Sequence, residues 1–182
     1  GQGATVEDRY GSNALTVTGA PAWVQGKRSS ALELDGATYG KKTGATGLPS
    51  TAVTFVGWRY LDTLANYRTI ISHEKGSNGG WWLDVDASGN LRFTVRSGGV
   101  DYTATKAGIA VATWYHVAGV YDGANVKVYL AGVLGTDAPL VGASLDSAGD
   151  LYVGVDDALA NYLDGLQDDD WLFPVALSLA GI

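Results

Sequence analysis

The chain of 182 residues contains no cysteine, which excludes disulfide bonds, thiolate metal sites and a cysteine nucleophile. It also contains no methionine, so we expect a processed product, a subfragment or an incomplete sequence. Glutamate is scarce, because only 3 of the 19 acidic residues are Glu and 16 are Asp. Asp favours turns over helix interiors, and 26 Gly residues favour turns as well. This composition predicts short strands joined by tight turns.

Three further absences narrow the class of protein. No segment repeats apolar residues at helical spacing over three turns. The net charge is −7 and the 12 basic residues are scattered, whereas nucleic-acid binding needs a basic stripe. The most apolar segment, Trp171–Ile182, is broken by Pro174 and is too short to cross a membrane, so we expect no membrane insertion. We expect one domain over residues 1–182, large enough to fold without covalent cross-links.

The central feature of the sequence is a predicted hairpin. Two β-rich runs, Trp114–Tyr121 and Val126–Leu130, flank a turn that begins with Asp122-Gly123. The stretch Trp81–Arg96 repeats this pattern, with apolar and polar residues alternating on both sides of a turn at 86–90. Further short strands are predicted at Gln2–Tyr10, Ala31–Asp35, Val53–Tyr60, Thr69–Ser72, Asp101–Lys106, Leu151–Val155 and Leu163–Phe173. Many short strands without helices predict an all-β, antiparallel two-sheet sandwich.

The hairpin also carries a family pattern. Trp114-Tyr115-His116-Val117-Ala118, Tyr121-Asp122-Gly123 and Val126-Lys127-Val128-Tyr129-Leu130 resemble the central hairpin of laminin-G-like domains. Those domains belong to the concanavalin A-like lectin/glucanase fold. The resemblance continues at Gly11, Asn13, Trp23, Val24, Gly26, Lys27, Ala31, Leu32, Asp35, Gly36 and the closing stretch Leu163–Phe173. It implies a jelly-roll sandwich, whereas function has to be argued from a site.

The same resemblance implies a calcium site. Laminin-G-like domains often hold Ca²⁺ on acidic loops, and Asp168 and Asp169 match the acidic pair of the family's closing motif. We expect Asp35 to face this pair, with carbonyl groups from the 8–13 loop completing the site. The alternative is that these Asp residues cap turns by accepting hydrogen bonds from backbone N–H groups. Asp170 departs from the family pattern, which has an apolar residue at that position.

A second candidate site is aromatic. Exposed indole or phenol rings stack on the C–H faces of sugars, while Arg and Asp side chains bind the hydroxyl groups. The residues proposed for such a site are Trp58, Tyr60, Trp82, Asp84, Arg92 and Arg96. The alternative is that these rings pack in the core. The aromatic residues expected in the core are Trp23, Trp81, Phe93 and Trp114.

Catalytic patterns are weak. A retaining glycosidase needs two carboxylates on one strand face, and Asp84-Val85-Asp86 offers only a pair that runs into a turn. His73-Glu74 is expected in a polar turn at a strand end, and His116 is expected to be a hydrogen-bonded structural residue. We therefore predict that the chain is not an enzyme.

The functional hypothesis that follows is a non-catalytic recognition module outside the cell or on a cell or virion surface. Its loops would bind a glycan or a protein surface, with Ca²⁺ fixing their shape. The alternative is a structural or decoration module whose rim contacts neighbouring subunits of a larger assembly, such as a virion surface or a multidomain extracellular protein.

Overall fold

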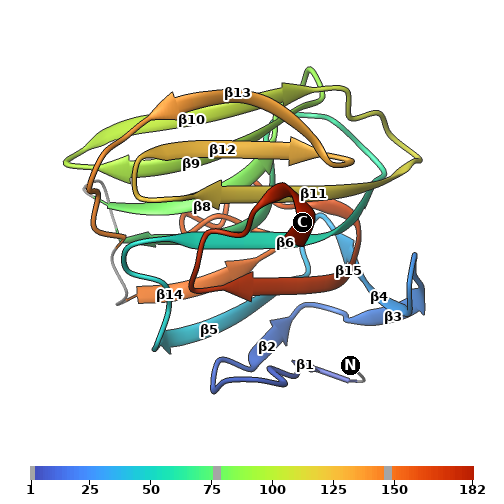
Figure 1. Cartoon of the computed structure of the whole chain (residues 1–182). Helices are drawn as coiled ribbons and strands as arrows, with labels where there is room; N and C mark the ends of the chain where they lie inside the picture. The colour runs from blue at the N-terminus through green and yellow to red at the C-terminus, as the bar shows by residue number, and fades with distance from the viewer. Residues whose placement is uncertain (1–2, 76–78, 146–148) are drawn as a thin grey trace.

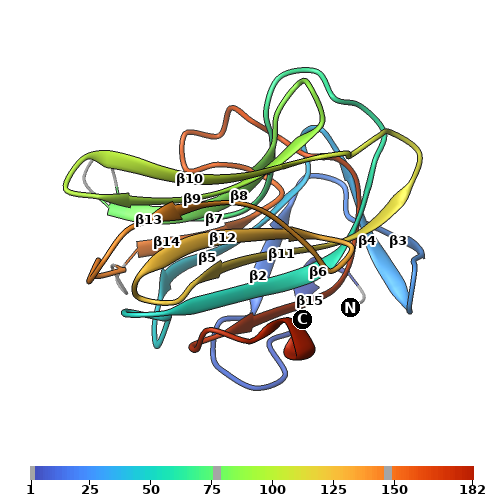
Figure 2. The same cartoon turned by 45° about the horizontal axis from the view of Figure 1, so that its top comes forward.

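Two antiparallel sheets form the computed structural model, which describes residues 3–75, 79–145 and 149–182 (Figure 1). The eight-stranded sheet has the order β1 (Thr5–Val6), β2 (Leu15–Thr18), β5 (Tyr39–Ala45), β14 (Gly149–Val153), β7 (Arg68–Lys75), β8 (Gly79–Val85), β9 (Asn90–Ser97), β10 (Val100–Ala107). The seven-stranded sheet has the order β13 (Val133–Pro139), β12 (Asn125–Leu130), β11 (Trp114–Tyr121), β6 (Val53–Leu61), β15 (Asp164–Phe173), β4 (Ser30–Asp35), β3 (Ala22–Gln25). Figure 2 shows the two sheets as stacked layers. The all-β sandwich prediction is confirmed.

The core lies between the inner faces of the two sheets, as the period-two pattern predicts. On the β8–β9 hairpin, Trp81, Leu83 and Phe93 are fully buried in the core, and Phe93 meets the inward face of β11 from the other sheet. The sheets approach closely at Gly119 of β11, where an added Cβ would lie 2.5 Å from Cδ2 of Phe93. Only a residue without a side chain fits against the Phe93 ring at this point.

The predicted central hairpin is present as β11 and β12, with register Val117↔Leu130 through Tyr121↔Val126. Its turn is held by Asp122, whose Oδ1 accepts hydrogen bonds from the backbone N–H groups of Ala124 (2.9 Å) and Asn125 (2.7 Å). This arrangement is the turn chemistry expected of Asp in that position.

Several strands differ from the prediction, among them β13, which was not predicted. The opening strand covers only Thr5–Val6, because the Asp8 carboxylate folds the following residues into a loop; Gln2 lies outside the described residues. β5 was not predicted, since its sequence is rich in Gly and Lys, and it forms by pairing with β2 and β14. β7 extends to Lys75, which places His73 and Glu74 inside a strand rather than in a turn.

The C-terminal segment crosses the outer face of the seven-stranded sheet over β6 and β11 (Figure 1). The Thr54 hydroxyl donates to the Val175 carbonyl (2.8 Å) and accepts from the Leu177 N–H (2.9 Å). Ile182 packs against a small apolar cluster that includes Val56 and Ala118. The described residues contain no helix long and apolar enough to span a membrane, and the short helix η1 (Leu179–Gly181) is a single 3₁₀ turn.

Candidate functional site

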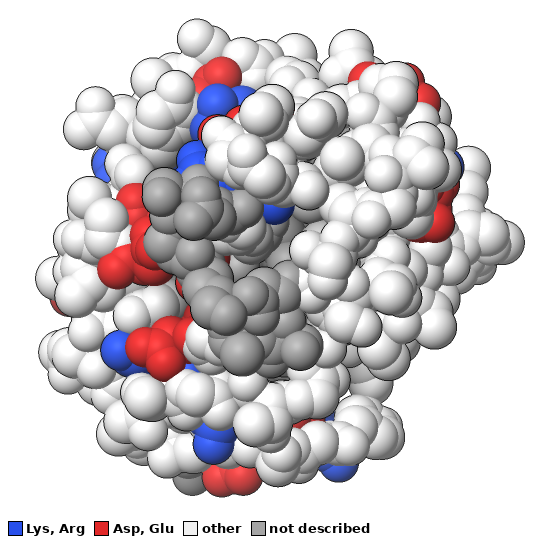
Figure 3. All heavy atoms as spheres, turned by 90° about the vertical axis from the view of Figure 1, so that its left-hand side faces the viewer, with Lys and Arg blue, Asp and Glu red and all other residues white. Residues whose placement is uncertain are grey.

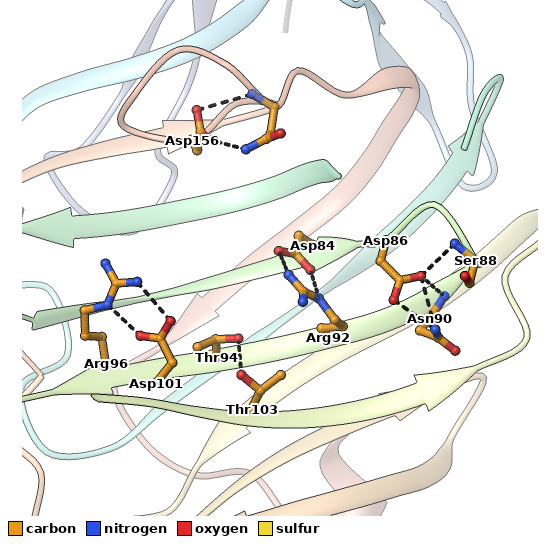
Figure 4. Close-up of polar contacts among 11 residues, drawn as sticks. Asp84, Asp86, Ser88, Asn90, Arg92, Thr94, Arg96, Asp101, Thr103 and Asp156 are labelled. Atoms are coloured by element: carbon orange, nitrogen blue, oxygen red, sulfur yellow. Dashed lines mark hydrogen bonds and ion pairs between the residues drawn. The ribbon is translucent and has the colours of Figure 1, made fainter. Parts of the chain in front are cut away.

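The outer face of β8, β9 and β10 carries a row of polar and aromatic side chains. Residues directly opposite one another in antiparallel strands share a face, and the register aligns Trp82 with Thr94 and Thr94 with Thr103. The two threonine hydroxyl groups lie 2.9 Å apart and form a hydrogen bond (Figure 4). The Trp82 indole is half-buried and points away from the core.

One step along the same strands, Asp84 and Arg92 form a bidentate ion pair. Arg92 Nε lies 2.8 Å from Asp84 Oδ1, and Arg92 Nη2 lies 2.6 Å from Asp84 Oδ2 (Figure 4). Burial raises the pKa of the Asp84 carboxyl, and the hydrogen bonds from Arg92 oppose this rise. The Arg92 guanidinium also lies 4.3 Å from the centre of the exposed Tyr67 ring.

On the other side of Trp82, Arg96 joins two strands. It binds Asp101 of β10 through Nε–Oδ1 (2.5 Å) and Nη2–Oδ2 (2.9 Å) (Figure 4). Its guanidinium also lies 4.9 Å from the centre of the Trp82 ring. Gly80 stands between Arg96 and Glu74 in the register, and its missing side chain lets Arg96 Nη1 reach within 3.8 Å of Glu74 Oε2.

Glu74 is a member of this site that sequence reasoning missed. Its side chain is 11% exposed, and burial raises the pKa of its carboxyl to about 7, with the charge of Asp157 adding to the rise and Arg96 opposing it. The prediction placed Glu74 in a turn because Gly76 follows closely. Polar Ser72 follows apolar Ile71, and polar Glu74 lies two positions after Ser72 on the same strand face. This period of two indicates that β7 continues.

A loop borders the site on the β7 side. The Ser72 hydroxyl donates to the carbonyl of Val155 (3.1 Å), which ties the loop to the sheet. Within the loop, Asp156 (Figure 4) accepts hydrogen bonds from the Ala160 N–H (2.8 Å) and the Asn161 side chain (2.6 Å). Asp156 therefore acts as a structural turn residue. We call the site the sheet-face cluster and define it as Glu74, Trp82, Asp84, Arg92, Arg96 and Asp101.

Two of the six predicted ligand-binding residues lie elsewhere. Trp58 and Tyr60 belong to β6, so they project from the outer face of the seven-stranded sheet, on the opposite side of the sandwich. The expectation that all six share one site is therefore wrong, because β6 and β8 belong to different sheets. Trp114 is also not in the core, since it lies beside Tyr60 and is half-buried. Trp81 and Phe93 are in the core as predicted, and Trp23 packs partly buried at its edge.

The three acidic residues predicted to hold Ca²⁺ do not come together. Asp35 pairs with Asp164, and Asp168 lies four residues further along β15, roughly 13 Å away. Asp35 accepts hydrogen bonds from the N–H groups of Ala37 and Thr38. These are turn-capping contacts, as the alternative interpretation expects.

Asp168 is also fully engaged by the protein. Its carboxylate accepts hydrogen bonds from the Arg28 N–H (2.7 Å), the Ser29 N–H (3.1 Å) and the Ser29 hydroxyl (3.0 Å). Asp169 instead binds the Trp171 indole N–H (3.0 Å). Within the described ranges, no three His, Asp or Glu side chains are grouped to hold a metal ion. In this arrangement Asp35, Asp168 and Asp169 do not fit one shared Ca²⁺ ion, so no role in binding is assigned to Ca²⁺.

The weak catalytic candidates have structural roles. Asp86 caps its turn by accepting hydrogen bonds from the Ser88 N–H (2.8 Å) and the Asn90 N–H (3.0 Å) (Figure 4). His73 is buried, with Nδ1 3.1 Å from the Asp150 carbonyl. His116 is half-buried against Trp58, with ring centres 5.3 Å apart, rather than held by the hydrogen bond that was expected.

Charges of both signs are mixed on one side of the molecule. Figure 3 shows one side of the molecule, where acidic and basic atoms lie next to one another among a larger uncharged area. This mixture does not favour a polyanionic partner on this side.

Comparison with known families is consistent with this architecture. A model of laminin-G-like domains, described as the concanavalin A-like lectin/glucanases superfamily, matches residues 34–182. The chain belongs to this superfamily. A sequence search of curated proteins gives no match.

Solved structures show that this superfamily fold is shared widely. Domain 4 of AbnA, an extracellular arabinanase from Geobacillus stearothermophilus, was solved in complex with arabinotriose. Its sequence is 22% identical and its TM-score is 0.78, and the match covers 91% of this chain and 84% of that chain. The LG4-5 domains of the mouse laminin alpha1 chain are 16% identical, with a TM-score of 0.67 and coverage of 82% and 42%. The binding domain of botulinum neurotoxin serotype G is 12% identical, with a TM-score of 0.72 and coverage of 94% and 46%. At these identities the matches establish the fold alone.

Proposed function

We propose that this chain is a non-catalytic carbohydrate-recognition domain that acts outside the cell and binds sugar on the sheet-face cluster. The observation that carries the proposal is a half-buried indole, Trp82, flanked by guanidinium and carboxylate groups on the outer face of the eight-stranded sheet. The AbnA domain, an extracellular protein that was solved with an oligosaccharide, supports this class of ligand and this location.

The chemistry of the cluster suits a sugar. The part of the Trp82 ring that Arg96 leaves open can stack on the C–H face of a sugar. Arg92 and Arg96 are each held in a bidentate pair, so their remaining N–H groups are fixed in direction before a ligand arrives. Side chains fixed in advance lose little conformational entropy on binding.

The same contacts support binding without catalysis. Both oxygens of Asp84 accept hydrogen bonds from Arg92, and both oxygens of Asp101 accept from Arg96. Asp86 is engaged by its own turn. A glycosidase needs an acid and a base or nucleophile that are free to act on the sugar. The carboxylates of Asp84, Asp86 and Asp101 are held by structural partners instead, so Glu74 has no second available carboxylate beside it in the cluster.

The test is a glycan array followed by calorimetric titration of the sugars that bind, with Trp82→Ala and Arg96→Ala variants. We expect each substitution to weaken binding by about tenfold, which corresponds to about 1.4 kcal/mol, a size typical of one aromatic or charged contact. Tyr10→Ala is the matched control, because it removes a ring that is 82% exposed and outside the cluster.

Unchanged affinity in both variants would refute the assignment of the site. Release of reducing ends from a bound polysaccharide would refute the non-catalytic part. A stable complex with another protein chain that ignores added sugar would favour a structural role in an assembly instead.

A further inference from the structure

The outer face of the seven-stranded sheet carries a second aromatic surface that the proposed function does not use. The register of β6 and β11 places Trp58 opposite His116 and Tyr60 opposite Trp114. Ring centres lie 5.3 Å apart in the first pair and 5.7 Å apart in the second. All four side chains are half-buried. We call these four residues the aromatic patch.

The patch begins where the C-terminal cover ends. The outward positions next to it on β6 and β11 are Val56 and Ala118, which belong to the apolar cluster against which Ile182 packs. Trp58 and His116 are the next outward residues along these strands, and they remain partly exposed to solvent. The C-terminal segment therefore covers the aliphatic residues on this outer face, whereas the neighbouring aromatic rings remain partly exposed.

Charged groups of both signs border the patch on the β3–β4 side. The ammonium group of Lys27 lies 5.3 Å from the centre of the Trp58 ring. Next to it, the exposed Arg28 faces Asp169 at 4.0 Å. The loop that carries Lys27 and Arg28 is fixed by the hydrogen bonds that Asp168 accepts from it.

His116 adds a polar group inside the patch. Burial lowers the pKa of its imidazole, and the nearby Arg59 charge lowers it further. The ring is therefore neutral at pH 7, and a neutral imidazole offers one hydrogen-bond donor and one acceptor. Sugar hydroxyl groups can use both.

We propose that the aromatic patch is a second carbohydrate-binding surface, which allows one domain to hold two sugar segments on opposite faces. Open aromatic rings with a border of mixed charge match an uncharged polyhydroxylated ring better than an ion of either sign. The two sheets of a sandwich pack about 10 Å apart and the two surfaces face away from each other, so a short oligosaccharide occupies only one of them. With longer polysaccharides, one domain would bridge two sugar segments by binding one on each face.

The experiment is calorimetric titration of the full chain with arabinotriose as the probe, together with light scattering of the chain mixed with soluble arabinan. We expect two sites in the unsubstituted chain. Tyr60→Ala and Trp114→Ala should each weaken the patch site about tenfold, and Trp82→Ala should weaken the cluster site about tenfold. Combining Trp82→Ala with Tyr60→Ala should weaken both sites. Scattering by arabinan should fall in every variant with a weakened site, because bridging needs both faces. Trp58→Phe, which keeps a ring, should retain two sites, and circular dichroism checks that each variant is folded.

The two proposals fail in different ways. If Trp82→Ala removes all binding and the patch variants change nothing, the patch proposal is overturned and the sheet-face cluster stands. If patch variants remove all binding and Trp82→Ala changes nothing, the patch is confirmed as a sugar site and the sheet-face cluster is refuted. A lower oligomeric state in the patch variants without any change in sugar binding would show a protein contact and overturn the patch proposal. Absence of heat with arabinotriose and of scattering with arabinan in the unsubstituted chain counts against both.

Discussion

Replacing Glu74 by Gln should stabilise the protein at pH 8 and leave its stability nearly unchanged at pH 4.5. In the folded chain, burial raises the pKa of the Glu74 carboxyl from an ordinary value of 4.5 to about 7, and Asp157 adds to this effect. Between these two values the unfolded chain has released the proton while the folded chain still holds it. The free energy of unfolding therefore falls as the pH rises through this range, and the loss is complete above pH 7.

The size of the effect follows from the same two values. A pKa difference between 4.5 and about 7 corresponds to about 3 kcal/mol of destabilisation at pH 8. Gln has no proton to release, so Glu74→Gln removes this penalty. The attraction of Arg96, which lies 3.8 Å away, is already included in this pKa, whereas solvent screening of the partly exposed carboxyl reduces the gain by about 1 kcal/mol. The expected net gain at pH 8 is therefore about 2 kcal/mol.

Urea unfolding at pH 4.5, 6 and 8 and constant ionic strength measures this difference. The control is Glu33→Gln, which changes an exposed carboxylate on β4 and should give a difference near zero at all three pH values. An equal pH dependence of the two variants, or a loss of stability in Glu74→Gln that is largest at pH 8, would contradict a raised pKa at Glu74.

Two further predictions concern carboxylates on β15. Arg59 is fully buried and binds Asp170 at 2.5 Å, so Asp170→Ala should cost about 3 kcal/mol in urea unfolding, while the double variant Arg59→Leu with Asp170→Leu should recover most of this loss. If the stability losses of the Arg59 and Asp170 substitutions were strictly additive in the double variant, this would contradict the ion pair between the two residues. Asp168→Ala should cost about 1–3 kcal/mol, because the N–H groups of Arg28 and Ser29 lose their acceptor. Neither EDTA nor Ca²⁺ should change the melting temperature of the unsubstituted chain, and a rise with Ca²⁺ that Asp168→Ala abolishes would restore the metal site.

The strands that could be predicted from the sequence are those whose pattern lies within one short stretch of the chain. The alternation from Trp81 to Arg96 assigned each side chain of the β8–β9 hairpin to the correct face, because adjacent strands and their turn carry the whole pattern. β5 carries no such signal, since Gly40 and Gly44 interrupt a run that includes Lys41 and Lys42. It becomes a strand through partners distant in sequence, β2 and β14, which no local window contains.

The same distinction explains the candidate site. Trp82, Asp84, Arg92 and Arg96 were correctly grouped because they lie on one hairpin with a fixed register. Their grouping with Trp58 failed because the sheet to which β6 belongs depends on pairing with β11 and β15. The expected cluster of Asp35 with Asp168 failed for a related reason, since both residues are on paired strands but four positions out of register.

The abundance of Asp also bears on where recognition takes place. Loops were expected to carry the contacts, yet the turn carboxylates of Asp8, Asp86, Asp122 and Asp156 each accept hydrogen bonds from the backbone of their own loop. A carboxylate that is already bonded in this way can bind a ligand only by giving up contacts that hold its loop. On the outer sheet faces the backbone hydrogen bonds run between strands, so a ligand need not break them. The partly exposed rings of Trp82 and of the aromatic patch can therefore contact a ligand without weakening a loop, which is why both proposed surfaces lie on sheets rather than on loops.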